Sequence, residues 1–277
     1  MSAVQEISDF SESQPVRWDI AVGCAVLGIA LMLVVMSPWL VTERDQLMDL
    51  NDRLATPFAW PHVLGTDQLG RDVASRIVMG LRWSFATAVC STLLAFAIGT
   101  VLGLVAARAG RASNFIRRLT ALAQSFPVFV LAVSVVALVG NGFFAVSTVL
   151  GLATWPVFCR VVQAEAASLF TREYVLAAQM LQMSRARLYR KHILPGLVSS
   201  LSVLVPFHFA DMLIAESALS FLGVGAPLGE ATWGSMLQES RSYLWSAPWL
   251  MLFPAAAIVT LVIAANLLGD GLRRKLV

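Results

Sequence analysis

Charged residues are scarce in this 277-residue sequence: only 13% are Asp, Glu, Lys or Arg, whereas 58% are hydrophobic and the mean hydropathy is +0.74. Soluble domains average about a quarter charged residues, so this chain has roughly half the charge needed to cover a water-facing surface. The deficit excludes a soluble globular enzyme and a disordered chain. The net charge of only +3 excludes a nucleic-acid binder. The composition predicts an integral membrane protein.

Cysteine and histidine are equally sparse, with three residues of each. Cys24, Cys90 and Cys159 lie far apart within apolar runs and lack C-x-x-C spacing, which is typical of small buried hydrophobic side chains. The histidines are too widely separated in the predicted topology to form a cluster for an intramembrane enzyme. No Walker A sequence occurs, so the chain itself is not expected to hydrolyse ATP. We therefore predict no catalytic residue, no metal site and no cofactor in this chain.

Six apolar runs are long enough, or nearly so, for the roughly 20 residues that a membrane-crossing helix needs. They cover about 20–40, 84–107, 119–140, 143–159, 197–224 and 247–268. The sequence thus predicts an all-α membrane protein with six transmembrane helices, preceded by a tail over residues 1–18. This tail is polar, contains three acids and lacks the basic start of a cleavable signal peptide.

The positions of the basic residues predict the orientation of these spans. Of the 20 Lys and Arg, 14 lie in the segments on the same side as the termini and six lie on the opposite side. Because basic residues concentrate in cytoplasmic segments, we expect both termini in the cytoplasm. The connector over 41–83 is then an outer loop, and the connector over 160–196 is an inner loop.

The inner loop contains two short helix patterns. Thr171 can cap the first helix, and Glu173 suits its first turn. Its predicted apolar face consists of Tyr174, Val175, Ala178 and Leu181, and Ala177 and Ala178 allow another surface to approach closely. Ser184 can cap a second helix, which ends before Pro195. The basic residues of this second helix are Arg185, Arg187, Arg190 and Lys191.

This helix pair has two interpretations. An amphipathic pair in a cytoplasmic loop suits insertion into a groove on a partner protein. The same pattern suits a pair that lies on anionic lipid. The pattern alone leaves both open.

The outer loop contains a turn followed by a helix start. The sequence GTDQLG at 65–70 signals a turn, and Asp67 can cap the helix that follows. Asp72 and Arg76 are spaced for an ion pair between residues i and i+4. Residues 71–83 are apolar at helical period, which predicts an interfacial helix that lies across the outer bilayer surface and leads into the second span.

Polar residues gather on one face of the fifth span. His208, Asp211, Met212 and Glu216 fall within an arc of about 140° at 100° per residue. Since a charge at mid-bilayer costs about 2.5–3.5 kcal/mol, we expect this face to point into the bundle or a wet cavity. Interhelical hydrogen bonding is favoured for Glu216, and lining of a translocation path for His208 and Asp211. Metal ligation by His208 and Asp211 is disfavoured, because two ligands on one helix do not make a closed site.

Four motifs in order resemble one family. They are EYVLAA (173–178) followed by KHILP (191–195), HVLGTDQLGRDVASR (62–76), LSFLGVG (219–225) and NLLGDGLR (266–273). Together they resemble ABC importer permeases of the dipeptide, oligopeptide and nickel group, in particular the second, C-type subunit. Gln182 stands where this family usually has a glycine suited to a left-handed turn, and Gly196 where it usually has asparagine.

The resemblance implies a type I ABC importer permease fold in the bacterial cytoplasmic (inner) membrane. It implies a homologous second permease as heterodimer partner, two ATP-binding subunits that hold ATP and Mg, and an extracytoplasmic solute-binding protein. The ATPase-coupling helix would comprise Glu173, Tyr174, Val175, Ala177, Ala178, Leu181 and Ser184. The rim that meets the binding protein would comprise Gly65, Thr66, Asp67, Gly70, Arg71 and Asp72.

The implied function is ATP-driven import of small peptides, nickel or metal chelates by alternating access. The short connector after the fifth span and the pair His208 and Asp211 slightly favour a metal cargo. An alternative is a self-sufficient secondary transporter or channel, which would need its own coupling-ion site and often has internal repeats. Only one predicted span contains ionisable groups and no repeat is evident, so the importer subunit is the main hypothesis.

Overall fold

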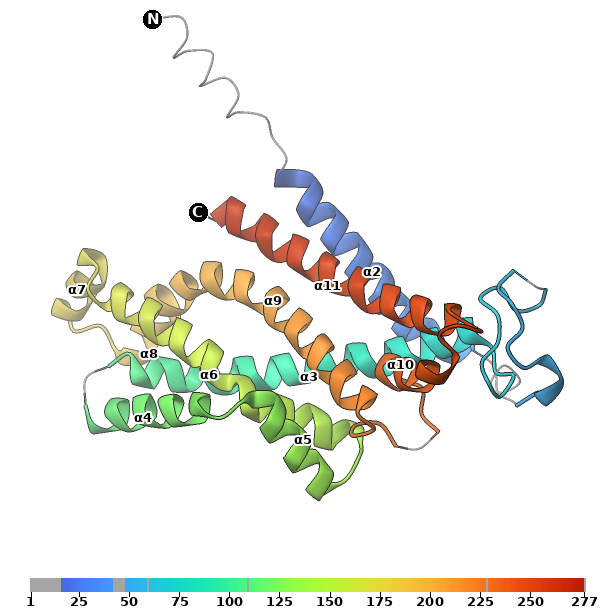
Figure 1. Cartoon of the computed structure of the whole chain (residues 1–277). Helices are drawn as coiled ribbons and strands as arrows, with labels where there is room; N and C mark the ends of the chain where they lie inside the picture. The colour runs from blue at the N-terminus through green and yellow to red at the C-terminus, as the bar shows by residue number, and fades with distance from the viewer. Residues whose placement is uncertain (1–15, 42–47, 59, 109, 228, 277) are drawn as a thin grey trace, which may run out of the picture.

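The computed structural model describes residues 16–41, 48–58, 60–108, 110–227 and 229–276 (Figure 1). Five helices are each long and apolar enough to cross a bilayer, and a bent helix pair is a sixth crossing if the pair makes one span. The helices confirm the predicted all-α membrane class, with five spans or, if the bent pair is one span, the predicted six. The predicted tail over 1–18 lies almost entirely outside the described residues.

The elements follow one another from α2 to α11 along the chain. The long helices are α2 (Val16–Leu40), α3 (Val73–Ala106), α6 (Phe143–Phe170), α9 (Leu194–Phe221) and α11 (Trp249–Leu276). The bent pair is α4 (Arg111–Ser125) and α5 (Val128–Val139). The short elements are η2 (Leu50–Asp52), α7 (Glu173–Met180), α8 (Arg185–Leu188), the π-helical turn η3 (Tyr189–Ile193), α10 (Trp233–Ser240) and η4 (Arg241–Tyr243).

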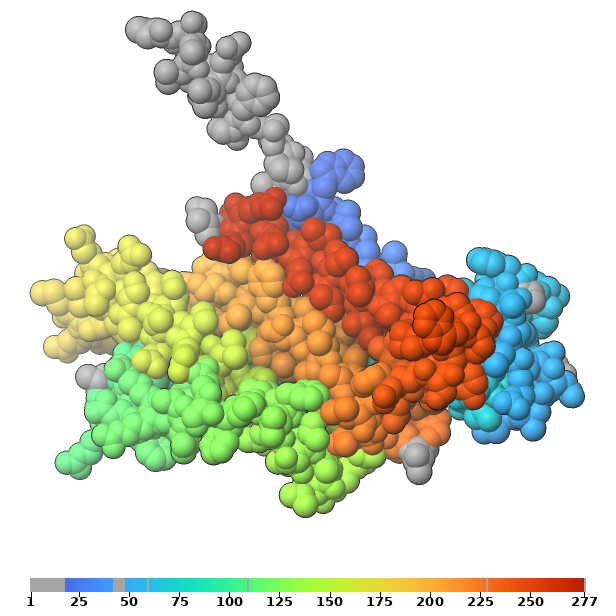
Figure 2. All heavy atoms as spheres, in the orientation of Figure 1, coloured from blue at the N-terminus to red at the C-terminus, as the bar shows by residue number. Residues whose placement is uncertain are grey.

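The bundle has two ends with different elements. The outer loop between α2 and α3 projects at one end, and α7 lies at the opposite end (Figures 1 and 2). Helix α3 packs mainly against α6 and also contacts α9, whereas α11 packs against both α2 and α9. An ion pair of 3.0 Å between Arg274 Nη1 and Asp19 Oδ2 joins the last turns of α11 to the start of α2.

Two predicted span boundaries need correction. Helix α3 begins at Val73 and is continuous to Ala106, so residues 71–83 form no separate interfacial helix. Helix α6 continues past Cys159 to Phe170, so the inner loop begins later than residue 160. Hydropathy detects the apolar part of a helix, whereas backbone hydrogen bonding and packing extend the helix into polar sequence.

The third predicted span is broken rather than straight. The axes of α4 and α5 meet at 83°. Phe126 between them is extended, at φ −95° and ψ 136°, because the ring of Pro127 disfavours helical backbone in the residue before it. Pro127 also has no N–H to continue the hydrogen bonds of α4. The apolar run over 119–140 therefore contains two helices.

Small residues bring α3 and α6 into close contact. Ala88, Ala95, Gly99 and Gly103 are buried on one side of α3 at spacings of four or seven residues. A Cβ atom at Gly99 would lie 2.5 Å from Phe158 Cβ and 2.6 Å from the Trp155 carbonyl oxygen. Small residues at such spacing let two helix backbones approach closely, which is how helices associate where lipid weakens the hydrophobic effect.

We expect Gly99→Ala to destabilise the subunit by about 1–3 kcal/mol, because the added methyl group would force α3 away from the backbone of α6. Gly28→Ala on α2 is the matched control, since no atom lies within 4 Å of a Cβ there and alanine is a better helix former than glycine. Thermal unfolding in detergent would measure both changes. Equal stability of the two variants would contradict this packing.

Candidate functional site

The inner loop is shorter than the predicted segment 160–196, because α6 extends to Phe170, and it contains the short helices α7 and α8. After α6 ends, Arg172 precedes α7 as its N-cap residue, without a side-chain capping bond. The predicted cap, Thr171, instead donates its hydroxyl to the Ser168 carbonyl oxygen at 2.8 Å. Ser184 stands at the N-cap of α8 as predicted, also without a capping bond from its side chain. The predicted end of this helix before Pro195 is wrong, because α8 continues through η3 into α9.

The predicted apolar face of α7 is divided between two sides. Val175 and Ala178 are buried and pack with Val162 of α6 and Leu197 of α9 in one apolar cluster. Tyr174 and Leu181 point away from this cluster and are 50% and 82% exposed. Since α7 is already anchored on the bundle through one side, its other side is available to a partner.

The exposed side of α7 also includes residues that the sequence did not single out. Leu176 and Met180 are exposed, Met180 by 84%, and Ala177 is exposed beside them. Large apolar side chains in water at the tip of a structured element are typical of an interaction surface. The apolar periodicity of this segment is visible in the sequence, but which half of it faces outward depends on packing against α6 and α9.

Gln182 makes the turn that glycine usually makes in the family. Its φ is +55°, in the left-handed region, and its N–H donates to the Gln179 carbonyl oxygen. The Met183 N–H donates to the Ala178 carbonyl oxygen at 3.1 Å. These two bonds form a Schellman motif, which ends a helix with one left-handed residue. The turn therefore keeps the helix-ending geometry despite the absence of glycine.

A cation–π cluster attaches the inner loop to α3. The Arg108 guanidinium lies 5.8 Å from the ring centroid of Phe170 and 5.4 Å from that of Tyr189. These rings come from the end of α6 and from η3, and their centroids are 5.9 Å apart. Each cation–π contact contributes about 0.5–2 kcal/mol. Arg108 thus links the segments on both sides of α7 to the end of the second span.

The outer loop is organised around the Asp67 carboxylate, which is almost fully buried. It accepts hydrogen bonds from the backbone N–H groups of Leu69 and Arg71 at 2.8 and 2.9 Å. It also pairs with Arg71 Nε at 2.7 Å and with Arg76 Nη1 at 2.6 Å. Gly70 has a φ of +76° and passes so close to Asp49 that no side chain would fit there.

Two capping and pairing predictions for this loop are wrong. The N-cap of α3 is Asp72, which accepts from the Ser75 N–H at 2.8 Å, whereas Asp67 holds the loop before it. Asp72 also lies 3.0 Å from His62 Nδ1 rather than pairing with Arg76. Arg76 instead reaches Asp67 and Glu239, because the loop folds over the first turns of α3.

Glu239 connects the outer loop to α10. Its carboxylate accepts from Gln68 Nε2 at 2.9 Å and pairs with Arg71 at 3.1 Å and Arg76 at 2.8 Å. A separate hydrogen bond joins α10 to α3: Trp233 Nε1 donates to the Ile77 carbonyl oxygen at 3.0 Å. Glu239 was not singled out from the sequence. Only an indirect indication of it is present there, since two arginines close together in the loop suggest a second acidic partner besides Asp67.

We expect the contact between this loop and α10 to weaken in acid. Burial would raise the pKa of the Glu239 carboxyl, but hydrogen bonds and charge from Arg76, with Gln68 and Arg71, outweigh burial and hold the pKa below its ordinary value of 4.5. A carboxyl with a lowered folded-state pKa contributes stability that is present above its unfolded pKa and lost as pH falls through the folded one.

Thermal unfolding from neutral pH down to about pH 3 would measure this loss. Glu239→Gln should lower stability at neutral pH and flatten the acid part of the profile. Glu230→Gln, at an exposed position in the preceding connector, is the control and should leave the profile unchanged. An acid profile unaffected by Glu239→Gln would contradict the proposed role of the carboxylate.

The predicted rim residues are mostly inside the loop. Gly65, Thr66, Asp67 and Gly70 are buried and therefore offer almost no surface to a docked protein. Arg71 and Asp72 are partly exposed. Large apolar side chains that do face outward from the loop are Phe58, Trp60 and Val63, at 85%, 92% and 54% exposure.

The structure separates the four residues singled out on the fifth span. His208 is buried with its Nδ1 3.3 Å from Thr92 Oγ1 and its ring 4.8 Å from that of Phe158. Glu216 is fully buried and accepts from the Ser220 and Ser217 hydroxyls at 2.9 and 3.4 Å.

Met212 is also buried, with its sulfur 3.8 Å from Thr154 Oγ1, whereas Asp211 is exposed. The prediction that this face points into the bundle or a wet cavity therefore holds for the three buried residues and is wrong for Asp211. His208, Met212 and Glu216 follow an i, i+4, i+8 row that is covered by neighbouring helices, and Asp211 falls outside that row.

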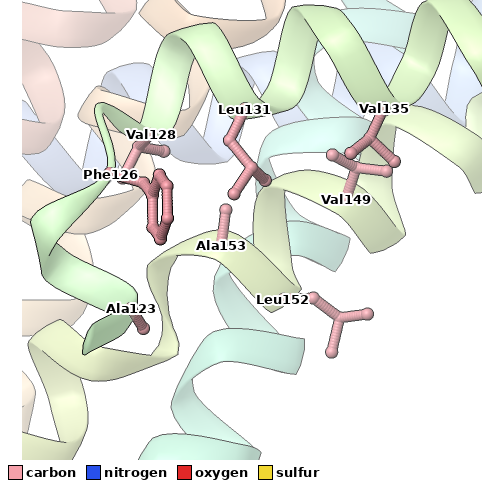
Figure 3. A pocket seen from close by; sticks show the side chains of 8 residues that line it. All are labelled: Ala123, Phe126, Val128, Leu131, Val135, Val149, Leu152 and Ala153. Carbon is pink, nitrogen blue, oxygen red and sulfur yellow. The ribbon is translucent and has the colours of Figure 1, made fainter. Parts of the chain in front are cut away.

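An apolar notch lies at the bend between α4 and α5 (Figure 3). Its volume is about 270 Å³, and its lining includes Ala123, Phe126 and Leu131 from the bent pair and Val149, Leu152 and Ala153 from α6. Such a lining suits an acyl chain or an apolar side chain. It offers no polar side chain that could orient a peptide or a metal complex.

The apolar helices that can cross a bilayer, the short helix α7 with an exposed apolar side at one end and the folded loop at the other end define a polytopic membrane protein. Residues 99–277, more than half of the chain, match the family described as binding-protein-dependent transport system inner membrane component. The chain belongs to this family and is an ABC importer permease of the peptide and nickel group in the inner membrane.

Relatives that are named for the substance they transport match most of the chain. The nickel transport system permease protein NikC of Escherichia coli K12 is 32% identical over 94% of both chains. The dipeptide transport system permease protein DppC of Alkalihalophilus pseudofirmus is 33% identical over 92% of this chain and 84% of its own. The glutathione transport system permease protein GsiD of Pectobacterium atrosepticum is 38% identical over 89% and 83%.

The fold also matches a solved structure. A crystal structure of an amino acid ABC transporter with histidines superposes with a TM-score of 0.56 over 73% of this chain and 94% of its own. At 15% identity this likeness concerns the fold alone. It supports the type I importer permease fold. Membership of the permease family, and not this likeness, displaces the alternative of a self-sufficient transporter or channel.

Proposed function

We propose that this chain is the C-type permease of a heterodimeric importer for small peptides, nickel or metal chelates. A homologous second permease completes the membrane passage, two ATP-binding subunits hold ATP and Mg, and an extracytoplasmic solute-binding protein delivers the cargo. Both termini and α7 lie in the cytoplasm. The observation that carries the proposal is the division of α7 into a buried anchoring side and an exposed apolar side.

The contacts of α7 support a mechanical role in alternating access. Val175 and Ala178 pack on the ends of α6 and α9, so α7 cannot move without them. Arg108 adds the end of α3 to the same group through Phe170 and Tyr189. An ATPase that grips the exposed side of α7 would therefore shift the inner ends of three spans together, and the passage between the two permeases would open and close.

The outer loop supports docking of a solute-binding protein in a different way from the predicted rim. The buried motif around Asp67 holds the loop in shape, and the exposed Phe58, Trp60 and Val63 present an apolar surface. In this proposal the motif positions the surface and does not itself touch the partner.

One argument for a metal cargo does not survive the packing of α9. The pair His208 and Asp211 favoured a metal, but His208 is buried against Thr92 and Phe158 while Asp211 is exposed. A cargo cannot contact both without unpacking α9. Small peptides and nickel, free or in a chelate, therefore remain equal candidates, since relatives are named for nickel transport and for dipeptide transport.

Co-purification tests the assembly. The chain expressed with its candidate partners should elute with two ATP-binding subunits and a second permease, and ATP hydrolysis should require that complex. The purified single chain should show no ATP turnover, and turnover by it alone would refute the division of labour. Mass spectrometry of ligand carried by the purified solute-binding protein would identify the cargo.

A further inference from the structure

Helix α9 exposes one stripe that contains a charge. Asp211 and Ile214 are exposed and Phe207 and Ala218 are half-buried, at spacings of three or four residues that place them on one side of the helix. The rest of its circumference packs against α3, α6, α10 and α11. Within the described part of the chain, no hydrogen-bond donor or basic side chain is paired with the Asp211 carboxylate.

Asp211 lies deep in the membrane. It stands ten residues before Phe221, where α9 ends, which corresponds to about 15 Å at 1.5 Å per residue. The adjacent Met212 contacts Thr154 near the middle of α6. Half of a hydrocarbon core about 30 Å thick is the same distance, so Asp211 is near the bilayer centre.

Lipid is an unfavourable neighbour for this side chain. A carboxylate at the bilayer centre costs about 2.5–3.5 kcal/mol on insertion scales, and such residues normally face a cavity or another protein group. The exposed side of α2 shows what a lipid-compatible surface in this chain looks like: Ile29, Met32 and Val35 are all apolar. The exposed stripe on α9 differs from this apolar side of α2 because it contains the carboxylate of Asp211 near the bilayer centre.

We propose that the α9 stripe lines the aqueous passage between the two permeases and that Asp211 makes this passage favour cationic cargo, such as a peptide ammonium group or a positively charged metal complex. The inference rests on the proposed function, since it needs a second permease to close the passage. A fixed negative charge in a low-dielectric wall concentrates cations beside it and repels anions.

The test uses the assembled complex in proteoliposomes, with Cys24, Cys90 and Cys159 replaced by alanine. A cysteine is placed at Ile214, on the same stripe, and its reaction with a cationic trimethylammonium and an anionic sulfonate methanethiosulfonate is timed with and without ATP. Residues three apart on a helix have Cβ atoms about 5–6 Å from each other, so Asp211 acts directly on the incoming reagent.

We expect Ile214→Cys to react with the water-borne reagents in at least one nucleotide state. The ratio of cationic to anionic rates should fall about tenfold or more when Asp211→Asn is added. Met32→Cys on α2 should react with neither reagent, and Glu230→Cys in the outer connector should react with a ratio that Asp211→Asn does not change.

Two results would overturn the inference while the complex still hydrolyses ATP: an unreactive Ile214→Cys in every state, or a rate ratio unaffected by Asp211→Asn. Cross-linking of Asp211→Cys to the second permease in all states would also overturn it, since the stripe would then be a sealed interface. Failure of the chain to assemble with ATP-binding subunits would instead refute the proposed function itself.

Discussion

Asp67→Ala is expected to destabilise the outer loop by about 3–5 kcal/mol, the range for removing one partner of a buried ion pair. The carboxylate is 1% exposed and accepts from two backbone N–H groups as well as from Arg71 and Arg76. Its loss would leave the backbone N–H groups of Leu69 and Arg71 without their acceptor. The side chains of Arg71 and of Arg76, which is 6% exposed, would keep Glu239 as their shared partner.

Asp67→Asn separates charge from shape. The amide oxygen can still accept backbone hydrogen bonds, but the ion pairs with both arginines are lost, so we expect an intermediate effect. Asp52→Asn, at an exposed position in the same loop, is the control and should change stability by less than about 0.5 kcal/mol. Thermal unfolding and protease sensitivity of the loop would measure all three variants. Similar values for Asp67→Ala and Asp52→Asn would show that the network is dispensable.

Leu181→Asp is expected to abolish ATP-driven uptake without unfolding the subunit. Leu181 is 82% exposed at the tip of α7, so a charge there costs the free subunit little. In a complex the same charge would be buried against the ATP-binding subunit without a partner, which weakens association on the order of a hundredfold. Binding of detergent-solubilised subunits and uptake by vesicles would measure the loss.

Two matched variants distinguish a docking defect from misfolding. Ala112→Asp, at an exposed position at the start of α4, adds the same charge away from α7 and should preserve assembly. Val175→Asp places the charge on the buried side of α7 and should lower the melting temperature as well as assembly. If Leu181→Asp retained full coupling, the exposed side of α7 would not be the surface that an ATPase grips.

Sequence patterns predicted this fold best where they repeat over many residues. Six apolar runs predicted six crossings, of which five are single long helices and the sixth corresponds to the bent pair of α4 and α5. The predictions were poorest at boundaries, where α3 begins at Val73 and α6 continues to Phe170. Hydropathy averages over a window, so it cannot show that a polar stretch keeps its backbone hydrogen bonds and packs against a neighbour.

The sites show the same division. The helical spacing of Tyr174, Val175, Ala178 and Leu181 located α7, but packing on α6 and α9 decided that only two of them are available to a partner. The motif at 62–76 predicted a turn and a helix start capped by Asp67, yet Asp67 instead holds the loop together from within. Glu239, far along the chain, could not be paired with Arg76 from sequence because nothing local relates the two.

The amino-acid sequence by itself determined that this protein lies in a membrane, how many apolar spans it has and which family it resembles. The length of apolar runs and the order of motifs can be read directly along the chain. The tertiary structure alone decided which polar side chains are buried. His208 and Glu216 are buried inside the subunit, whereas Asp211, on the same helix, is exposed on its surface. Successive side chains of a helix point in directions about 100° apart. Which of these directions are buried depends on where the neighbouring helices pack.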